Sequence, residues 1–162
     1  MRRWADFARE APDLAALGHD RFARAGIVLV GTIRKDGTPR ISPVEFYVVR
    51  GDLALGMMWQ SYKARDLLRD PRCLVHSVVT SRAGTEGEFK LRGRAVEATD
   101  PDFRRAYGDA TEAEIDWRPS EPFHLFRLDV EDAAYVVYEE DEKRTTRWTP
   151  ELGIRRAVGP PA

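Results

Sequence analysis

The segment from Ile27 to Val44 reads IVLVGTIRKDGTPRISPV and decides the fold expected for this chain. Its first part, residues 27–33, is a compact and largely β-branched apolar run, which is typical of a buried strand. An Asp-Gly pair at positions 36–37 is a strong signal for a tight hairpin turn. A second strand is predicted over residues 39–49, where Pro43 has no backbone N–H to donate and therefore belongs at an edge or a bulge. The segment thus predicts an antiparallel hairpin.

The rest of the chain adds strands and inserts helices between some of them. Further strands are predicted over residues 53–60, 72–79, 88–98, 123–130 and 133–138, with one more edge strand at 143–148. Helices are predicted over residues 4–9, 14–26 (capped by Asp13), 61–70 (capped by Ser61), 101–107 and 112–117. The first three strands have no helix between them, whereas parallel strands need long crossovers. The pattern therefore favours a mainly β fold with inserted helices, an antiparallel barrel rather than a doubly wound parallel sheet.

Length and composition suit one domain, which we expect to span residues 1–162. We expect a helical segment at 1–25 and an acidic turn, an edge strand and a tail at 139–162, the tail being Pro160-Pro161-Ala162. The formal net charge of −1 offers no attraction to nucleic acid. No apolar stretch approaches the roughly 20 residues that cross a membrane, and we expect no signal peptide. The one cysteine, Cys73, allows no internal disulfide, which fits a cytoplasmic location.

The segment from Met57 to Leu68 reads MMWQSYKARDLL and carries the chemistry of the predicted site. A strand ends there, the chain turns, and a helix begins with Ser61 as its cap and Lys63 in its first turn. Free backbone N–H groups and the helix dipole attract an anion to such a helix start. The dipole opposes a cation there by about 0.3–1 kcal/mol, so Lys63 is better explained by a bound phosphate. A lysine directed into water is the alternative explanation.

Several segments follow one another in an order that resembles a known family. They are the strand at 27–33, DGTPRISPV at 36–44, SYKARDL at 61–67, DPR at 70–72 and LRGRA at 91–95. The ordered set resembles the pyridoxamine 5'-phosphate oxidase-like, FMN-binding split-barrel family, over roughly residues 22–137. The resemblance implies a six-stranded antiparallel split β-barrel of the Greek-key type. It also implies a homodimer with two cofactor sites at the subunit interface.

The same resemblance implies roles for individual positions. Ser61 and Lys63 match residues that hold the flavin phosphate, and Arg40 lies where some members carry a phosphate-clamping arginine. Three residues of the second strand would run beside the flavin ring, and four that follow the third strand would line the approach to the ribityl chain and the phosphate. The ring-side residues are Ser42, Pro43 and Val44, and the others are Met57, Met58, Trp59 and Gln60.

The chain also departs from the true pyridoxamine phosphate oxidases. Those enzymes carry a basic residue where this chain has Tyr62, and a lysine where it has Glu45. Their Arg-x-His motif near the carboxyl end is absent from this sequence. We therefore expect a substrate other than pyridoxamine phosphate.

Three functions are compatible with these residues. The leading hypothesis is an FMN-dependent oxidoreductase that acts on a small organic substrate, with Glu45 and Tyr47 as the first side chains to test. A reductase that uses a deazaflavin is the second hypothesis. The third is a non-catalytic flavin- or haem-binding protein, with His124 as the candidate haem ligand. The histidines lack metal-ligand spacing, so we expect no metal site.

Overall fold

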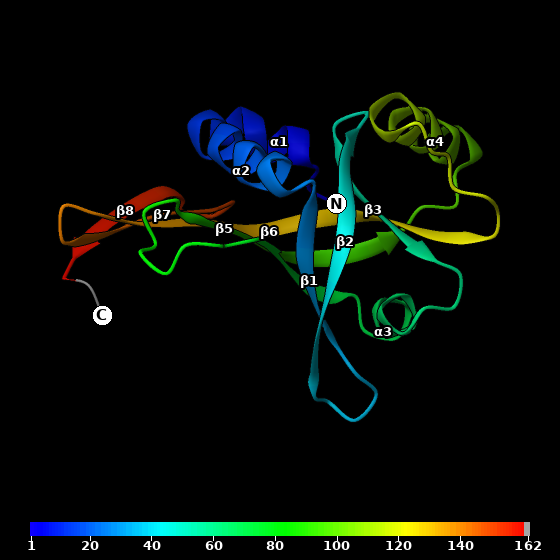
Figure 1. Ribbon diagram of the computed structural model, residues 1–162, viewed down its shortest axis with the longest axis horizontal. Coiled ribbons are helices and arrows are strands. Elements are labelled where there is room, and N and C mark those ends of the chain that lie inside the picture. Colours follow the sequence, from blue (N-terminus) through cyan, green and yellow to red (C-terminus); the bar gives the residue numbers. More distant parts are fainter. Residues whose placement is uncertain (161–162) are drawn as a thin grey trace.

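The computed structural model describes residues 1–160 and is built around one antiparallel sheet (Figure 1). Residues 1–160 form four helices and eight strands. The helices are α1 (Trp4–Glu10), α2 (Pro12–Ala25), α3 (Tyr62–Arg69) and α4 (Pro101–Ile115). The strands are β1 (Ile27–Ile33), β2 (Pro39–Val49), β3 (Asp52–Met58), β4 (Arg72–Ser77), β5 (Glu88–Glu97), β6 (Phe123–Glu139), β7 (Glu142–Thr149) and β8 (Gly153–Gly159). Among these helices, none is long and apolar enough to cross a membrane.

The sheet closes on itself into a six-stranded barrel. The strand order is β3-β2-β1-β4-β5-β6-β7-β8, and an additional pairing joins β3 to β6. The first half of β6 pairs with β3, from Phe123 opposite Met58 to Arg127 opposite Ala54. The second half of β6 runs on to β7 and β8, which extend from the barrel as a wing (Figure 1). The predicted fold, a mainly β six-stranded antiparallel barrel, is confirmed.

The barrel is open along part of the boundary between β2 and β3. β2 pairs with β1 over residues 39–45, but its pairing with β3 begins only at Phe46, which lies opposite Leu55. Beyond Leu55, residues 56–58 of β3 pair with β6 and no longer with β2. One edge of β2 is therefore free over residues 39–45. Pro43 lies in this part, as predicted, where its missing N–H leaves no gap in a ladder.

Aromatic side chains fill the end of the barrel beneath α1 and α2. Phe22 of α2 meets Phe89 of β5 with ring centroids 5.2 Å apart, and Phe7 of α1 meets Trp148 of β7 at 4.9 Å. All four side chains are buried. Such edge-on and tilted aromatic pairs are favourable beyond the area they bury. The two N-terminal helices thus close one end of the barrel and join it to the wing.

Helix α4 packs on the outer side of the barrel next to the opening. Tyr107 of α4 is buried with its ring 5.4 Å from that of Tyr47 on β2. Its hydroxyl lies so close to Gly56 of β3 that a Cβ atom at Gly56 would be 2.1 Å from it. The glycine therefore permits the close approach of α4 to the strand.

The structure differs from the predicted elements in four places. The N-cap of α2 is Ala11, and Asp13 lies within the first turn. Residues 123–138 form one continuous strand, because the pairing of β5 with β6 skips Glu131 through a bulge and then resumes. The helix predicted at 112–117 is the end of α4. Residues 153–159 form strand β8, which pairs with β7, so the strand predicted at 143–148 does not lie at the edge of the sheet. Pro161 and Ala162 of the predicted tail lie outside the described residues.

Asp66 ties α3 to the β1–β2 hairpin. Its buried carboxylate accepts hydrogen bonds from Thr32 Oγ1 at 3.0 Å and Arg40 Nε at 2.7 Å, and lies 3.3 Å from Arg69 Nη2. Burial alone would raise the pKa of Asp66, but the hydrogen bonds from Arg40, Thr32 and Arg69 outweigh it and lower the pKa. The charged carboxylate therefore stabilises the folded state.

We predict that Asp66→Asn lowers the free energy of unfolding by about 1–3 kcal/mol at neutral pH, since it weakens several charge-assisted hydrogen bonds. Because the folded pKa lies below the unfolded value of about 4, this stabilisation is complete above pH 4 and is lost as the pH falls through the folded pKa. Urea unfolding at several pH values measures both effects. A difference between wild type and variant that does not shrink in acid would contradict the assignment.

Candidate functional site

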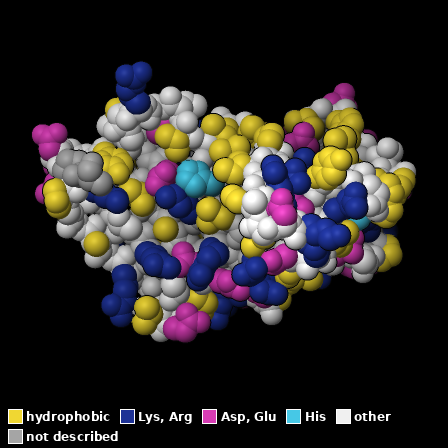
Figure 2. Space-filling view, turned by 90° about the horizontal axis from the view of Figure 1, so that it is seen from below, with side chains coloured by type: hydrophobic (Ala, Val, Ile, Leu, Met, Phe, Trp, Pro, Cys, Tyr) yellow, Lys and Arg dark blue, Asp and Glu magenta, His cyan; other side chains and the backbone are white. Residues whose placement is uncertain are grey.

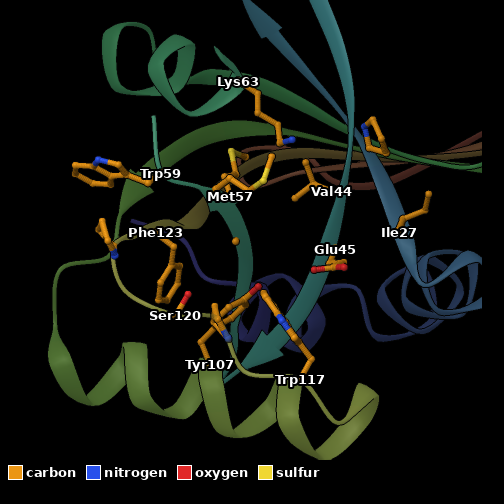
Figure 3. A pocket seen from close by; sticks show the side chains of 15 residues that line it. Ile27, Val44, Glu45, Met57, Trp59, Lys63, Tyr107, Trp117, Ser120 and Phe123 are labelled. Carbon is orange, nitrogen blue, oxygen red and sulfur yellow. The ribbon is translucent and has the colours of Figure 1, made fainter. Parts of the chain in front are cut away.

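A cavity of about 480 Å³ occupies the opening between β2 and β3 (Figure 3). Its walls come from the free edge of β2, the end of β3, the start of α3, and the α4–β6 connection. The lining residues are Ile27, Pro43, Val44, Glu45, Gly56, Met57, Met58, Trp59, Lys63, Tyr107, Trp117, Pro119, Ser120, Pro122 and Phe123. Most of them are apolar or aromatic, which suits a flat organic ring more than a sugar or a peptide.

Two side chains of opposite charge line this otherwise apolar cavity. Lys63 extends from the first turn of α3 into the cavity, and Glu45 lies on β2 on the opposite side (Figure 3). Within residues 1–160, Lys63 forms no ion pair, so its charge is available to an anionic ligand. A ligand with an anionic group at one end fits this arrangement.

The hydroxyl of Ser61 also lacks a partner. Ser61 is the N-cap residue of α3, as predicted, but its side chain makes no capping hydrogen bond. Its Oγ atom is buried and has no hydrogen-bond partner in residues 1–160. An unpaired buried hydroxyl costs free energy, and a phosphate held at the helix start would give it an acceptor. The charge of Lys63 at this helix start therefore fits the phosphate of a flavin, whereas Ser61 does not itself line the cavity.

Trp59 forms one wall of the cavity, and the ring of His124 stacks against it. The two rings are stacked, with centroids 4.4 Å apart and an interplanar angle of 11°. His124 is buried on β6, and its Nδ1 lies 3.1 Å from Glu97 Oε1. Its Nε2 is buried as well and meets no hydrogen-bond partner among the described residues. The role of His124 as a haem ligand stays a prediction.

Arg40 lies in a different place from Lys63. Its Nε is 2.7 Å from Asp66 Oδ2, and its guanidinium lies over the ring of Tyr62 at 5.3 Å. It lines a second cavity of about 530 Å³, whose walls are Arg34, Lys35, Asp36, Arg40, Tyr62, Arg65, Asp66 and Arg69. Lys63 and Tyr62, although adjacent in sequence, thus face two cavities on either side of the start of α3. We call this second cavity the basic cavity.

The structure brings together six of the ten predicted site residues. Those that line the cavity between β2 and β3 are Pro43, Val44, Met57, Met58, Trp59 and Lys63. Three further predicted residues line neither this cavity nor the basic cavity, namely Ser42, Gln60 and Ser61. Each of them is next in sequence to a residue that lines one of the two cavities. Of the two side chains chosen for testing, Glu45 lines the cavity, whereas Tyr47 is buried against Tyr107.

Sequence reasoning missed the far wall of the cavity. This wall consists of Tyr107 on α4, of Phe123 at the start of β6, and of four residues in the connection between them, namely Trp117, Pro119, Ser120 and Pro122. Burial raises the pKa of the Tyr107 phenol, so this group stays neutral beside Gly56. Only Trp117 gave a signal, as an aromatic residue that stacks on rings or fills a core. The others carry no local pattern that predicts contact with β2 or β3.

Among residues 1–160, no cluster of three or more His, Cys, Asp or Glu side chains is arranged to hold a metal ion. Cys73 is buried, and this burial raises its pKa to about 12. Its thiol is therefore protonated and inert at neutral pH. The chemistry of the site thus rests on Lys63, Glu45 and the aromatic walls.

Solved structures with the same fold come from several bacteria. A pyridoxamine 5'-phosphate oxidase-related, FMN-binding protein from Nostoc punctiforme is 14% identical, with a TM-score of 0.61 over 93% of this chain and 96% of that chain. PhzG from Burkholderia lata, solved with tetrahydrophenazine-1-carboxylic acid, is 12% identical, with a TM-score of 0.63 over 98% and 93% of the two chains. A heme binding protein from Mycobacterium smegmatis is 14% identical, with a TM-score of 0.54 over 91% and 88%.

At these identities the structural likeness shows the fold alone. None of the curated proteins matches the sequence. The family model described as pyridoxamine 5'-phosphate oxidase, however, matches residues 19–137, which is more than half of the chain. The resemblance inferred from the ordered segments is thereby confirmed, and the chain belongs to the pyridoxamine 5'-phosphate oxidase family.

Proposed function

We propose that this protein is an FMN-binding oxidoreductase that acts on a small organic substrate other than pyridoxamine phosphate. The observation that carries the proposal is the cavity between β2 and β3, an apolar opening with one unpaired cation, Lys63, at the start of a helix. A flavin mononucleotide has the matching form, since it joins a flat ring to a terminal phosphate. Bound FMN would supply the hydride chemistry, because no side chain here performs a redox step.

The protein's own residues would bind and orient this cofactor. Lys63 would pair with the phosphate, and the buried hydroxyl of Ser61 would donate to it. The free edge of β2, from Pro43 to Glu45, would present backbone polar groups to the edge of the ring. Trp59 and the residues of the α4–β6 connection would exclude water from the ring.

The substrate would occupy the part of the cavity beside Glu45. This carboxylate is the only acidic group that lines the cavity within the described chain. It would accept a proton from the substrate or orient a substrate cation. The family's pyridoxamine phosphate enzymes have a lysine at this position, according to the resemblance, so a change of sign here supports a different substrate. Two neighbours of the same fold, one named as an FMN-binding protein and one solved with tetrahydrophenazine-1-carboxylic acid, support a ligand with a fused ring system.

A homodimer is the second part of the proposal. Large apolar side chains near the two cavities are exposed in a single copy, namely Ile41, Met58, Trp59, Tyr62 and Trp117. Exposed apolar residues clustered in this way mark an interface more often than a free surface. A second copy that covers them would also close the cavity between β2 and β3 from the open side.

We predict that the purified protein binds FMN and that Lys63→Ala weakens this binding by about 1.5–3 kcal/mol, the range for a charge-assisted hydrogen bond. Quenching of flavin fluorescence during titration measures the affinity. Lys143→Ala, on β7 and outside both cavities, is the matched control, since it removes the same charge and should leave the affinity unchanged.

The same titration with a deazaflavin separates the alternatives. Tight binding of the deazaflavin with weak binding of FMN would overturn the choice of cofactor and move the function to reduction by a deazaflavin. Equal loss of FMN affinity in the Lys63 and Lys143 variants would refute the phosphate assignment. If the protein binds FMN but turns over neither a nicotinamide donor nor an organic substrate, it is a flavin carrier and not an enzyme.

We also predict that Ile41→Glu converts the dimer into a monomer. Ile41 lies on β2 with 72% of its surface exposed, and a carboxylate buried at an interface is costly. Sedimentation or light scattering should show the molar mass halved. Val158→Glu on β8, at 63% exposure, is the control and should remain dimeric. A wild-type protein that is already monomeric would contradict the homodimer.

A further inference from the structure

The two ends of the cavity between β2 and β3 carry opposite charges. Lys63 enters the cavity from α3, whereas Glu45 lies on β2, on the side formed by α4 and its connection to β6 (Figure 3). Helix α3 contains three basic residues and one carboxylate, but residues 100–122, which include α4, contain three arginines and seven carboxylates. Figure 2 shows Lys and Arg side chains gathered on the face that carries α3, and α4 lies on the opposite side of the molecule (Figure 1). A ligand that spans the cavity therefore meets a basic end and an acidic end.

The carboxylate of Glu45 has no cation of its own. Within the described part of the chain it forms neither an ion pair nor a hydrogen bond. Two arginines on the α4 side are already engaged, since Arg104 pairs with Glu121 at 2.8 Å and Arg118 with Glu112 at 2.8 Å. The lysine across the cavity is assigned to the cofactor phosphate. With that phosphate bound, the charge of Glu45 is left uncompensated in the lining.

The charge of Glu45 acts on the phenols of the far wall. Tyr107 lines the cavity and is buried, and Tyr47 packs against it. Burial raises the pKa of both phenols, and the negative charge of Glu45 raises each pKa further, with Glu114 of α4 acting on Tyr47 as well. Both phenols are therefore neutral at physiological pH, and the acidic end of the cavity favours a positive charge on its occupant.

Aromatic rings line the same end of the cavity. Trp117 and Tyr107 lie on the side of Glu45, across from Lys63 (Figure 3). The face of such a ring attracts an organic cation that lies within about 6 Å of the ring centroid. The guanidinium of Arg104 already lies over the ring of Phe123, 4.1 Å from its centroid, so a ring of this wall accepts a cation within the protein itself. A carboxylate beside ring faces is the chemistry that recognises an ammonium group.

Desolvation makes this end selective for charge. Glu45 is exposed in a single copy, so water satisfies its carboxylate while the cavity is open. A ligand that fills the opening removes this water, and a carboxylate left without water or a partner is costly. A cationic group on the ligand replaces the lost water with an ion pair, which a neutral or anionic group does not.

We propose that the substrate is a small organic cation, a protonated amine or a quaternary ammonium, whose charged nitrogen lies between Glu45 and the ring of Trp117. The inference rests on the proposed function, because it names the substrate class for that site. Of the two roles open to Glu45, proton acceptor and partner of a cation, it selects the second. Glu45 is thus a specificity-determining residue.

Calorimetric titration of the FMN-saturated protein with three probes of one shape tests the proposal. The probes are 2-phenylethylammonium, the neutral 2-phenylethanol and the anionic phenylacetate. We expect the ammonium to bind at least about tenfold tighter than the alcohol, and phenylacetate to bind most weakly. Glu45→Gln should abolish most of this tenfold preference and change the affinity for the alcohol less than about twofold. Trp117→Leu should lower the ratio of ammonium to alcohol affinity about threefold.

Glu114→Gln is the matched control. It removes the same charge from an exposed position on α4 that lines neither cavity, so it should change the preference less than about twofold. Equal loss of preference in the Glu45 and Glu114 variants would overturn the proposal, because it would reduce the effect to general attraction. An ammonium probe that binds no tighter than the alcohol to protein that does bind FMN would overturn the substrate class alone. Failure of the wild type to bind FMN would overturn the proposed function and this inference together.

Discussion

The pairing of β3 with β6 closes the barrel and, by doing so, creates the site. β3 uses residues 54–58 to pair with β6, while its pairing with β2 ends at Leu55. β2 continues along β1 in the other direction as far as Pro39. The two strands must therefore diverge, and the cavity fills the opening between them. The same divergence explains why the apolar and backbone groups of β2 at positions 43–45 remain available to a ligand.

Helix α3 depends on this arrangement and divides it into two regions. The buried carboxylate of Asp66 fixes the helix to Thr32 and Arg40 of the hairpin. Its first turn then places Lys63 at the apolar cavity and Tyr62 at the basic cavity. The helix held by Asp66 thus presents a single cation, Lys63, to one cavity and the side chains of Arg65 and Arg69 to the other. Successive side chains around a helix point in different directions, so α3 presents different charges to the two cavities.

Local sequence determined the elements around this site. The β-branched run at 27–33, the Asp-Gly turn and the alternation after it fixed β1 and β2 at the bounds that the structure shows. The missing N–H of Pro43 located the free edge of β2, and Ser61 marked the start of α3. These features depend on backbone chemistry within a few residues, so they are readable without the fold. The ordered set of segments likewise indicated the family and, with it, the barrel.

Only the tertiary structure decided which side chains meet. The resemblance predicts a phosphate-clamping role for Arg40, but its pairing with Asp66, 26 positions away, places it in the basic cavity. Trp117 and Phe123 reach the cavity because α4 packs against Gly56, a contact that no local pattern encodes. The continuity of β6 through Glu131 arises in the same way, from its ladder with β5, a strand far from it in sequence. Periodicity and turn chemistry determine where strands and helices form, whereas packing between distant segments determines which of their charges face one another.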